Sequence, residues 1–111
     1  MDCNHNLKTD SKHICSNYHE AIEFIGRRWM GMIIYSLMDG PKRFSELADE
    51  INGISDRLLT ERLNELVKEE LVSKTYLEDS SKKVEYALTE RGMSLKKVIE
   101  AILAWIAENE K

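Results

Sequence analysis

The sequence has 111 residues, of which 42% are hydrophobic and 32% are charged, and its net charge at pH 7 is −4. This length fits one domain, and the balance of apolar and charged residues excludes an intrinsically disordered chain. The acidic net charge is not typical of nucleic-acid-binding proteins, in which Lys and Arg cluster. Any case for DNA binding therefore has to come from the architecture of the chain.

We expect neither a membrane protein nor a secreted one. No stretch approaches the ~20 consecutive apolar residues that cross a bilayer. Residues 1–15 carry no apolar run behind their basic residues, unlike a signal peptide. The expected location is the cytoplasm, where Cys3 and Cys15 remain reduced and are too few for a disulfide scaffold.

Two helices are predicted in the first third of the chain. Residues 1–14 are polar and aperiodic, which predicts a flexible tail before a domain that spans residues 15–111. Over residues 17–25, apolar side chains recur at the i, i+3, i+4, i+7 spacing of an amphipathic helix. Residues 29–38 are apolar nearly all round, which predicts a helix in the middle of the core. The Asp-Gly-Pro sequence at 39–41 ends it.

A short helix, a tight turn and a longer helix follow. Phe44 and Ser45 have the character of a staple residue and an N-cap, which predicts a third helix over residues 46–51. Asn-Gly at 52–53 is a turn signal. Ser55 is the next N-cap candidate, and it opens a fourth helix to about residue 70 whose leucines form one buried stripe.

Beyond residue 70 the apolar period changes from 3.6 to 2. Residues 71–77 and 84–88 predict two antiparallel strands joined by a polar tip. Thr89 is the N-cap candidate of the last helix, which carries Gly92 in its first turn and has a broad apolar face. This order predicts a mainly α fold with a small β-hairpin. It is a winged helix-turn-helix, whose fourth helix enters the major groove and whose hairpin is the wing.

Polar side chains of the fourth helix and the wing are the candidate DNA contacts. The helix places several of them opposite its leucine stripe, and Arg and Asn suit bidentate contacts with guanine and adenine edges. A helix N-terminus and wing-tip lysines suit phosphates. The candidates are Arg43, Ser55, Arg57, Thr60, Glu61, Asn64, Lys68, Lys82 and Lys83. The alternative for each is an ordinary solvent-facing polar residue.

Further basic residues stand next to helix ends, as the pairs Arg27-Arg28 and Lys42-Arg43. They suit either the flanks of a DNA site or the neutralisation of helix C-termini. Sequence alone does not choose between these two roles.

The last helix carries more apolar surface than a three-helix core can bury. This excess predicts a homodimer built by the last helix, with the apolar face of the first helix beside it. The expected interface residues are Tyr18, Ile22, Leu95, Val98, Ile99, Ile102, Trp105 and Ile106. Symmetric pairing would place two recognition helices about 34–36 Å apart, which is one turn of DNA.

Four stretches carry a resemblance to a known family. They are residues 25–29 (IGRRW), 37–47 (LMDGPKRFSEL), 53–63 (GISDRLLTERL) and 84–92 (VEYALTERG). In them the sequence resembles the HxlR family, a branch of the MarR-like bacterial winged-helix regulators, over nearly everything from residue 15 onward. The resemblance implies a homodimeric transcriptional regulator, expected to be a repressor, that binds a pseudo-palindromic operator in double-stranded DNA.

The resemblance also implies a role for Cys15. In the quinone- and oxidant-sensing subgroup a reactive cysteine lies shortly before the first helix, and Cys15 occupies that place. This implies redox sensing through a small electrophile or quinone at Cys15. Ser16 and the Ser81-Lys82 pair depart from the subgroup, which commonly has proline there. No cysteine follows Cys15, so an oxidised Cys15 would pair with Cys3 or with Cys15 of a second copy.

Other functions are weighed against this one. Cys3, His5, His13 and Cys15 offer sulfur and nitrogen donors for a metal-responsive regulator, although their spacing matches no standard zinc finger. A winged helix that binds only protein is a second alternative, favoured by the acidic charge. The sequence has no Gly-rich phosphate loop and no nucleophile elbow, so we expect no enzymatic activity, no cofactor and no bound metal.

Overall fold

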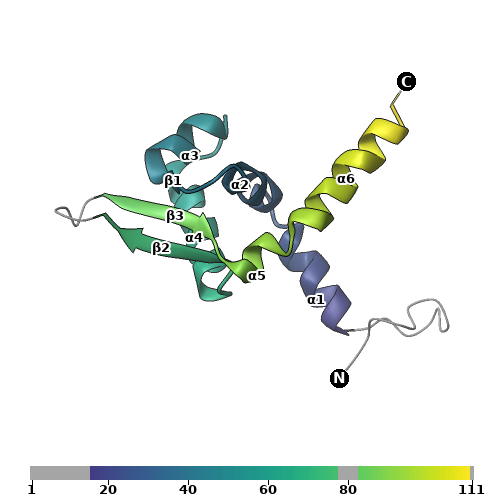
Figure 1. The fold of residues 1–111 in the computed structure, drawn as a ribbon, viewed down its shortest axis with the longest axis horizontal. Helices are drawn as coiled ribbons and strands as arrows, with labels where there is room; N and C mark the ends of the chain where they lie inside the picture. Colours follow the sequence, from purple (N-terminus) through teal and green to yellow (C-terminus); the bar gives the residue numbers. More distant parts are fainter. Residues whose placement is uncertain (1–15, 78–82, 111) are drawn as a thin grey trace.

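A computed structural model describes residues 16–77 and 83–110 of the chain. The elements in chain order are α1 (Ser16–Ile25), α2 (Met30–Leu37), β1 (Lys42–Arg43), α3 (Phe44–Glu50), α4 (Asp56–Lys68), β2 (Val72–Tyr76), β3 (Val84–Leu88), α5 (Glu90–Met93) and α6 (Lys96–Glu108). Figure 1 shows the β2–β3 hairpin on one side of the molecule and α1 and α6 on the other. The predicted fold class, a mainly α winged helix-turn-helix with a small hairpin, is confirmed.

The strands form a three-stranded antiparallel sheet in the order β1-β3-β2. Lys74 of β2 lies opposite Tyr86 of β3, and Lys42 of β1 lies opposite the same tyrosine on its other side. The sequence did not predict β1. Two residues are too few to show a period of 2, so only their tertiary pairing with β3 reveals this strand.

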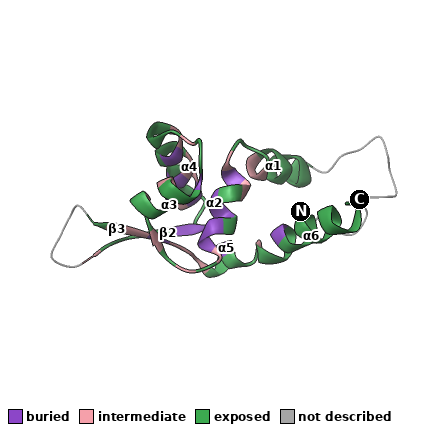
Figure 2. Cartoon of the chain, turned by 90° about the horizontal axis from the view of Figure 1, so that it is seen from above, coloured by how far each residue is buried: buried purple, intermediate pink, exposed green. Residues whose placement is uncertain are grey.

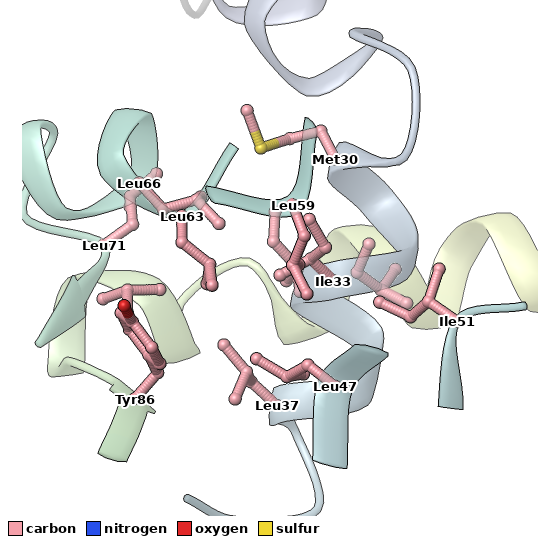
Figure 3. Packing of buried hydrophobic residues seen from close by; sticks show 13 residues of the cluster. Met30, Ile33, Leu37, Leu47, Ile51, Leu59, Leu63, Leu66, Leu71 and Tyr86 are labelled. Carbon is pink, nitrogen blue, oxygen red and sulfur yellow. The ribbon is translucent and has the colours of Figure 1, made fainter. Parts of the chain in front are cut away.

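The core lies between α2, α3, α4 and the sheet (Figure 3). The leucine stripe predicted for the fourth helix is confirmed, because Leu59, Leu63 and Leu66 are completely buried. Tyr86 points from β3 toward α4. The buried cluster consists of Met30, Ile33, Ile34, Leu37, Leu47, Ile51, Leu59, Leu63, Leu66, Leu71, Val72, Tyr86 and Ile99. One face of α4 is therefore anchored in the core.

The second helix is less buried than predicted. It begins at Met30, because the preceding Trp29 has a left-handed φ of 74°. One side of α2 faces the core, but Met32 and Tyr35 are 51% and 53% exposed. The prediction of a helix buried on all sides is therefore wrong. The apolar residues of α2 therefore include two, Met32 and Tyr35, that the single chain leaves exposed.

The third helix begins earlier than predicted. It starts at Phe44, so Ser45 lies inside its first turn and is not the N-cap. Arg43 precedes the helix in an extended conformation, and its backbone N–H donates to Glu46 Oε1 over 2.7 Å. Because α3 follows β1 directly, Arg43 is both the last residue of the strand and the N-cap of the helix.

The last predicted helix is in fact two helices, α5 and α6. Thr89 caps α5 as predicted, since its Oγ1 accepts a hydrogen bond from the backbone N–H of Gly92 over 3.0 Å. Gly92 is buried against the backbone of Leu71, at the entrance to β2. This close contact holds α5 against the sheet, and the chain bends before α6 begins. A helical period in the sequence does not reveal such a contact.

The N-cap and the first turn of α5 also close the end of α4. Glu70, just beyond α4, has a left-handed φ of 62°. Thr89 Oγ1 donates to the Glu70 carbonyl over 2.6 Å, and Arg91 Nε donates to the Glu69 carbonyl over 3.0 Å. Backbone acceptors left unpaired at the end of a helix need such partners. The C-terminal end of α4 and the start of α5 are thus joined directly.

α1 and α6 extend away from this core and are mostly exposed (Figure 2). The predicted first helix is confirmed, but it has no buried residue, and Ile99 is the buried residue of α6. Both projecting helices therefore present apolar side chains that the single chain does not cover.

Among residues 16–77 and 83–110, no helix combines the length and the apolar character that spanning a membrane requires.

Candidate nucleic-acid interface

α3, a turn and α4 form the helix-turn-helix. The turn passes through Gly53, whose φ is 101°. Ser55 is the N-cap of α4, as predicted, because its hydroxyl oxygen accepts a hydrogen bond from the Leu58 N–H over 3.1 Å. The cap fixes the first turn of α4 and leaves the O–H of the exposed Ser55 as a donor. A phosphate at this helix end would meet both that donor and the positive end of the helix dipole.

The polar face of α4 is exposed along its whole length. Arg57, Thr60, Glu61, Asn64 and Lys68 are all exposed, as expected for the side opposite the buried leucines. The side chain of Arg57 is 90% exposed, and its Nε lies 3.7 Å from Glu61 Oε2. Exposed ion pairs of this kind are weak. Arg57 can therefore exchange Glu61 for another acceptor at little energetic cost.

The basic residues of the sheet are not equally available. Arg43 and Lys83 are exposed, whereas Lys82 lies outside the described residues. The side chain of Lys42 is only 13% exposed, and its Nζ lies 2.7 Å from Glu50 Oε2. Of the Lys42-Arg43 pair, only Arg43 is thus presented to a ligand.

Lys42 belongs to a polar cluster that joins α2 to α3. Its Nζ donates to both carboxylate oxygens of Glu50, at 2.8 and 2.7 Å, and the hydroxyl of Ser36 donates to Glu50 as well. The hydrogen bonds from Lys42 and then Ser36 hold the pKa of Glu50 below its ordinary value. The cluster fixes the end of α3, and it was not predicted from the sequence because its members come from three different elements.

Arg62 ties α4 to the segment before α2. Its Nε donates to the Arg28 carbonyl over 2.9 Å, and its NH1 lies 3.2 Å from Glu65. Arg27 also reaches Glu65, at 3.4 Å. Arg27 thus has an acidic partner on α4, and together these contacts tie α4 to the segment between α1 and α2. The i, i+3 spacing of Arg62 and Glu65 was the available sequence signal.

Apolar side chains are exposed on α1, α2 and α6, and we call this set the apolar surface. Its members are Tyr18, Ile22, Met32, Tyr35, Val98, Ile102, Leu103, Trp105 and Ile106, each 36–64% exposed. Of the other two residues predicted for a dimer interface, Ile99 is buried in the core cluster of the single chain and Leu95 is half-buried against it. Met32, Tyr35 and Leu103 were not predicted. A cavity of about 310 Å³ lies where α2 meets α6 within this surface.

The helix-turn-helix seen in the structure agrees with the protein family that the sequence matches. Residues 24–111 match the family described as HxlR-like helix-turn-helix. The chain belongs to this family. The HxlR-like match covers the helix-turn-helix, the wing and α6, and so includes every element that positions the polar face of α4.

Relatives in the HxlR-like family are transcriptional regulators. The HTH-type transcriptional regulator YodB of Bacillus subtilis is 44% identical over 92 residues, which are 83% of this chain and 82% of YodB. The crystal structure of quinone-bound YodB from B. subtilis superposes with a TM-score of 0.76 at 41% identity, covering 86% of this chain and 99% of that one. The redox regulator HypR in its reduced form gives 0.78 at 32% identity, covering 84% and 92%. This HxlR-like chain is a transcriptional regulator with redox-sensing relatives.

The remaining predicted site residues lie outside the described part of the chain. They are Cys3, His5, His13 and Cys15. Within residues 16–77 and 83–110 no His, Cys, Asp and Glu side chains gather into a group that could hold a metal ion. Both the sensing role of Cys15 and the metal alternative therefore stay predictions from sequence.

Proposed function

We propose that this HxlR-like regulator binds a pseudo-palindromic operator as a homodimer and represses transcription, without enzymatic activity. The observation that carries the proposal is the exposed polar face of α4, whose opposite face is fixed in the core by Leu59, Leu63 and Leu66. α4 has 13 residues and is about 20 Å long. A helix of this size, held rigidly by one face, fits the major groove of B-DNA.

Each part of the interface has its own proposed role. Arg57 and Asn64 read base edges, because guanidinium and amide groups form bidentate pairs with guanine and adenine. Ser55 and Lys83 contact phosphates, which fix the orientation of α4 but carry no sequence information. The other proposed contacts are Arg43, Thr60, Glu61, Lys68 and Lys82.

A second copy of the chain is the proposed cover of the apolar surface. α1 is 10 residues long and has no buried residue, and helices shorter than ~12–15 residues are marginal on their own in water. Trp105 is 64% exposed and Tyr35 is 53% exposed, which is costly for large apolar side chains. Burying them between two copies stabilises α1 and α6 and presents two α4 helices to successive turns of DNA.

Cys15 is the proposed switch, consistent with quinone-bound YodB and the redox regulator HypR among the relatives. It directly precedes Ser16, the first residue of α1, and helix N-termini favour the reactive thiolate. An adduct there would change how α1 packs in the dimer. The spacing of the two α4 helices would follow, and a few kcal/mol between two spacings is enough to release an operator.

The test is binding to the DNA immediately upstream of the chain's own gene, measured by gel shift with competitor DNA. We expect specific binding that a quinone or diamide abolishes in the wild type. Cys15→Ser should bind the same DNA and ignore both treatments. Cys3→Ser is the matched thiol control for the quinone, because an adduct at Cys15 needs no second thiol; its response to diamide tells whether Cys3 or Cys15 of a second copy pairs with the oxidised Cys15. Absence of specific binding would overturn the operator proposal. A Cys15→Ser variant that is still released would overturn the switch alone.

A further inference from the structure

An exposed lysine and tyrosine stand together on the wing, away from the apolar surface. Tyr76, the last residue of β2, is 59% exposed. The Nζ atom of the exposed Lys74 lies 5.7 Å from the centroid of its ring, within the range of a cation–π contact. The period of 2 in residues 71–77 predicted a strand but did not point to either residue.

The two side chains leave the sheet on its helix-covered face. Side chains alternate along a strand, so Lys74 and Tyr76 share the face of the buried Val72. Lys74 also lies directly opposite Tyr86, which points toward α4 (Figure 3). β2 is the edge strand of the sheet. The pair is therefore on the side of the wing where α4 lies, beyond the end of the core.

We propose that Lys74 and Tyr76 form a backbone-contacting site for double-stranded DNA between α4 and the wing tip. The proposal rests on the DNA binding proposed above and adds residues to it. The ammonium of Lys74 neutralises one phosphate, which releases condensed counterions. The ring of Tyr76 holds that ammonium in place and packs against the adjacent sugar. Because sugar and phosphate are the same in every sequence, the site strengthens binding without reading bases.

The experiment measures affinity for operator and for random duplex DNA across a salt series. Lys74→Gln should lower affinity for both DNAs to a similar degree and reduce the slope of log K against log salt by about 0.9, the value for one phosphate. Tyr76→Ala should weaken both about threefold or more, while Tyr76→Phe keeps the ring and should bind like the wild type. Thr75→Ala is the matched control, because Thr75 is exposed on the opposite face of β2. Thermal unfolding of each variant should stay at the wild-type midpoint.

Three results would overturn the inference. In the first, Lys74→Gln keeps the wild-type salt slope while Arg57→Ala loses operator affinity, which leaves the proposed function intact and removes only this site. In the second, the wild type binds no duplex DNA, and the proposed function then fails together with the inference. A loss of affinity for the operator alone, with random DNA unaffected, would also contradict a backbone contact.

Discussion

A Cβ atom placed on Gly92 would lie 2.0 Å from the carbonyl oxygen of Leu71. No other residue type fits between α5 and the start of β2 without moving the backbone, since real Cβ atoms do not approach so closely. The contact sets how α5 meets the sheet, and through α5 it sets where α6 leaves the core. The close approach that only glycine allows at position 92 thus couples the position of the β2–β3 hairpin to that of α6, which carries part of the apolar surface.

We expect Gly92→Ala to destabilise the chain by about 1–3 kcal/mol or more, as overpacking of a tight contact does. Urea unfolding checks the midpoint and slope. Gly31→Ala in α2 is the matched control, because a Cβ there meets no atom within 4 Å and alanine favours a helix over glycine. Equal midpoints for both variants would show that α5 adjusts freely.

Glu50 should make stability depend on pH. Its folded pKa lies below the ordinary value, because Lys42 and Ser36 donate hydrogen bonds to its carboxylate. Stability from this group is therefore present above the unfolded pKa and is lost as pH falls through the folded pKa. We expect Glu50→Gln to be less stable than the wild type at pH 7 and to lose less stability on acidification.

Urea midpoints at several pH values between neutral and acid conditions measure the Glu50 effect. Glu108→Gln, a change of an exposed carboxylate on α6, is the control and should follow the wild type. Parallel pH curves for the wild type and Glu50→Gln would contradict the role given to the Lys42 cluster.

Arg57 and Lys83 should differ in what they contribute to DNA binding. Arg57→Ala is expected to cost about 1–3 kcal/mol of discrimination at one base pair, with unchanged stability, because its ion pair with Glu61 is exposed. Lys83→Ala should weaken operator and random DNA alike. Anisotropy titrations with matched and mutated operators separate the two. An equal loss on both DNAs for both variants would contradict the division of roles.

Trp105→Glu should break the proposed homodimer, because it places a charge on the most exposed side chain of the apolar surface, which the second copy would bury. Light scattering at micromolar concentration should report a dimer for the wild type and a monomer for the variant. Lys96→Glu, at the start of α6, changes charge outside the apolar surface and serves as control. A monomeric wild type would remove the dimer from the proposal.

Local signals in the sequence predicted the parts of the fold that local chemistry decides. Ser55 and Thr89 were identified as caps because an N-cap needs only its own helix. The break between α5 and α6 was missed, because it depends on Gly92 meeting a residue that lies far away in sequence. β1 was missed for the same reason, since its pairing partner Tyr86 is in another strand.

The residues of the candidate site also divide into those that a local pattern predicts and those that depend on contacts between elements. The exposed face of α4 follows from helical period alone, so Arg57 and Asn64 were found. The contacts by which Arg62 and Lys42 orient α4 and α3 were not predicted, because the acceptors in these contacts come from other elements. The apolar composition of residues 29–38 also assigned Tyr35 to the core. A sequence pattern does not distinguish an apolar residue buried in the core of its own chain from one that a second copy would bury.

Both ends of α4 are closed from within the chain. The Ser55 hydroxyl accepts at the first turn, while beyond the last turn the Leu71 N–H donates to the Leu66 carbonyl over 2.9 Å and Thr89 binds the Glu70 carbonyl. The helix is therefore preorganised. The conformational entropy of ordering its termini is lost when the protein folds, not when a ligand binds. In the proposed complex with DNA, association therefore resembles the docking of a rigid body, and its selectivity depends on the side chains that α4 carries, not on induced folding.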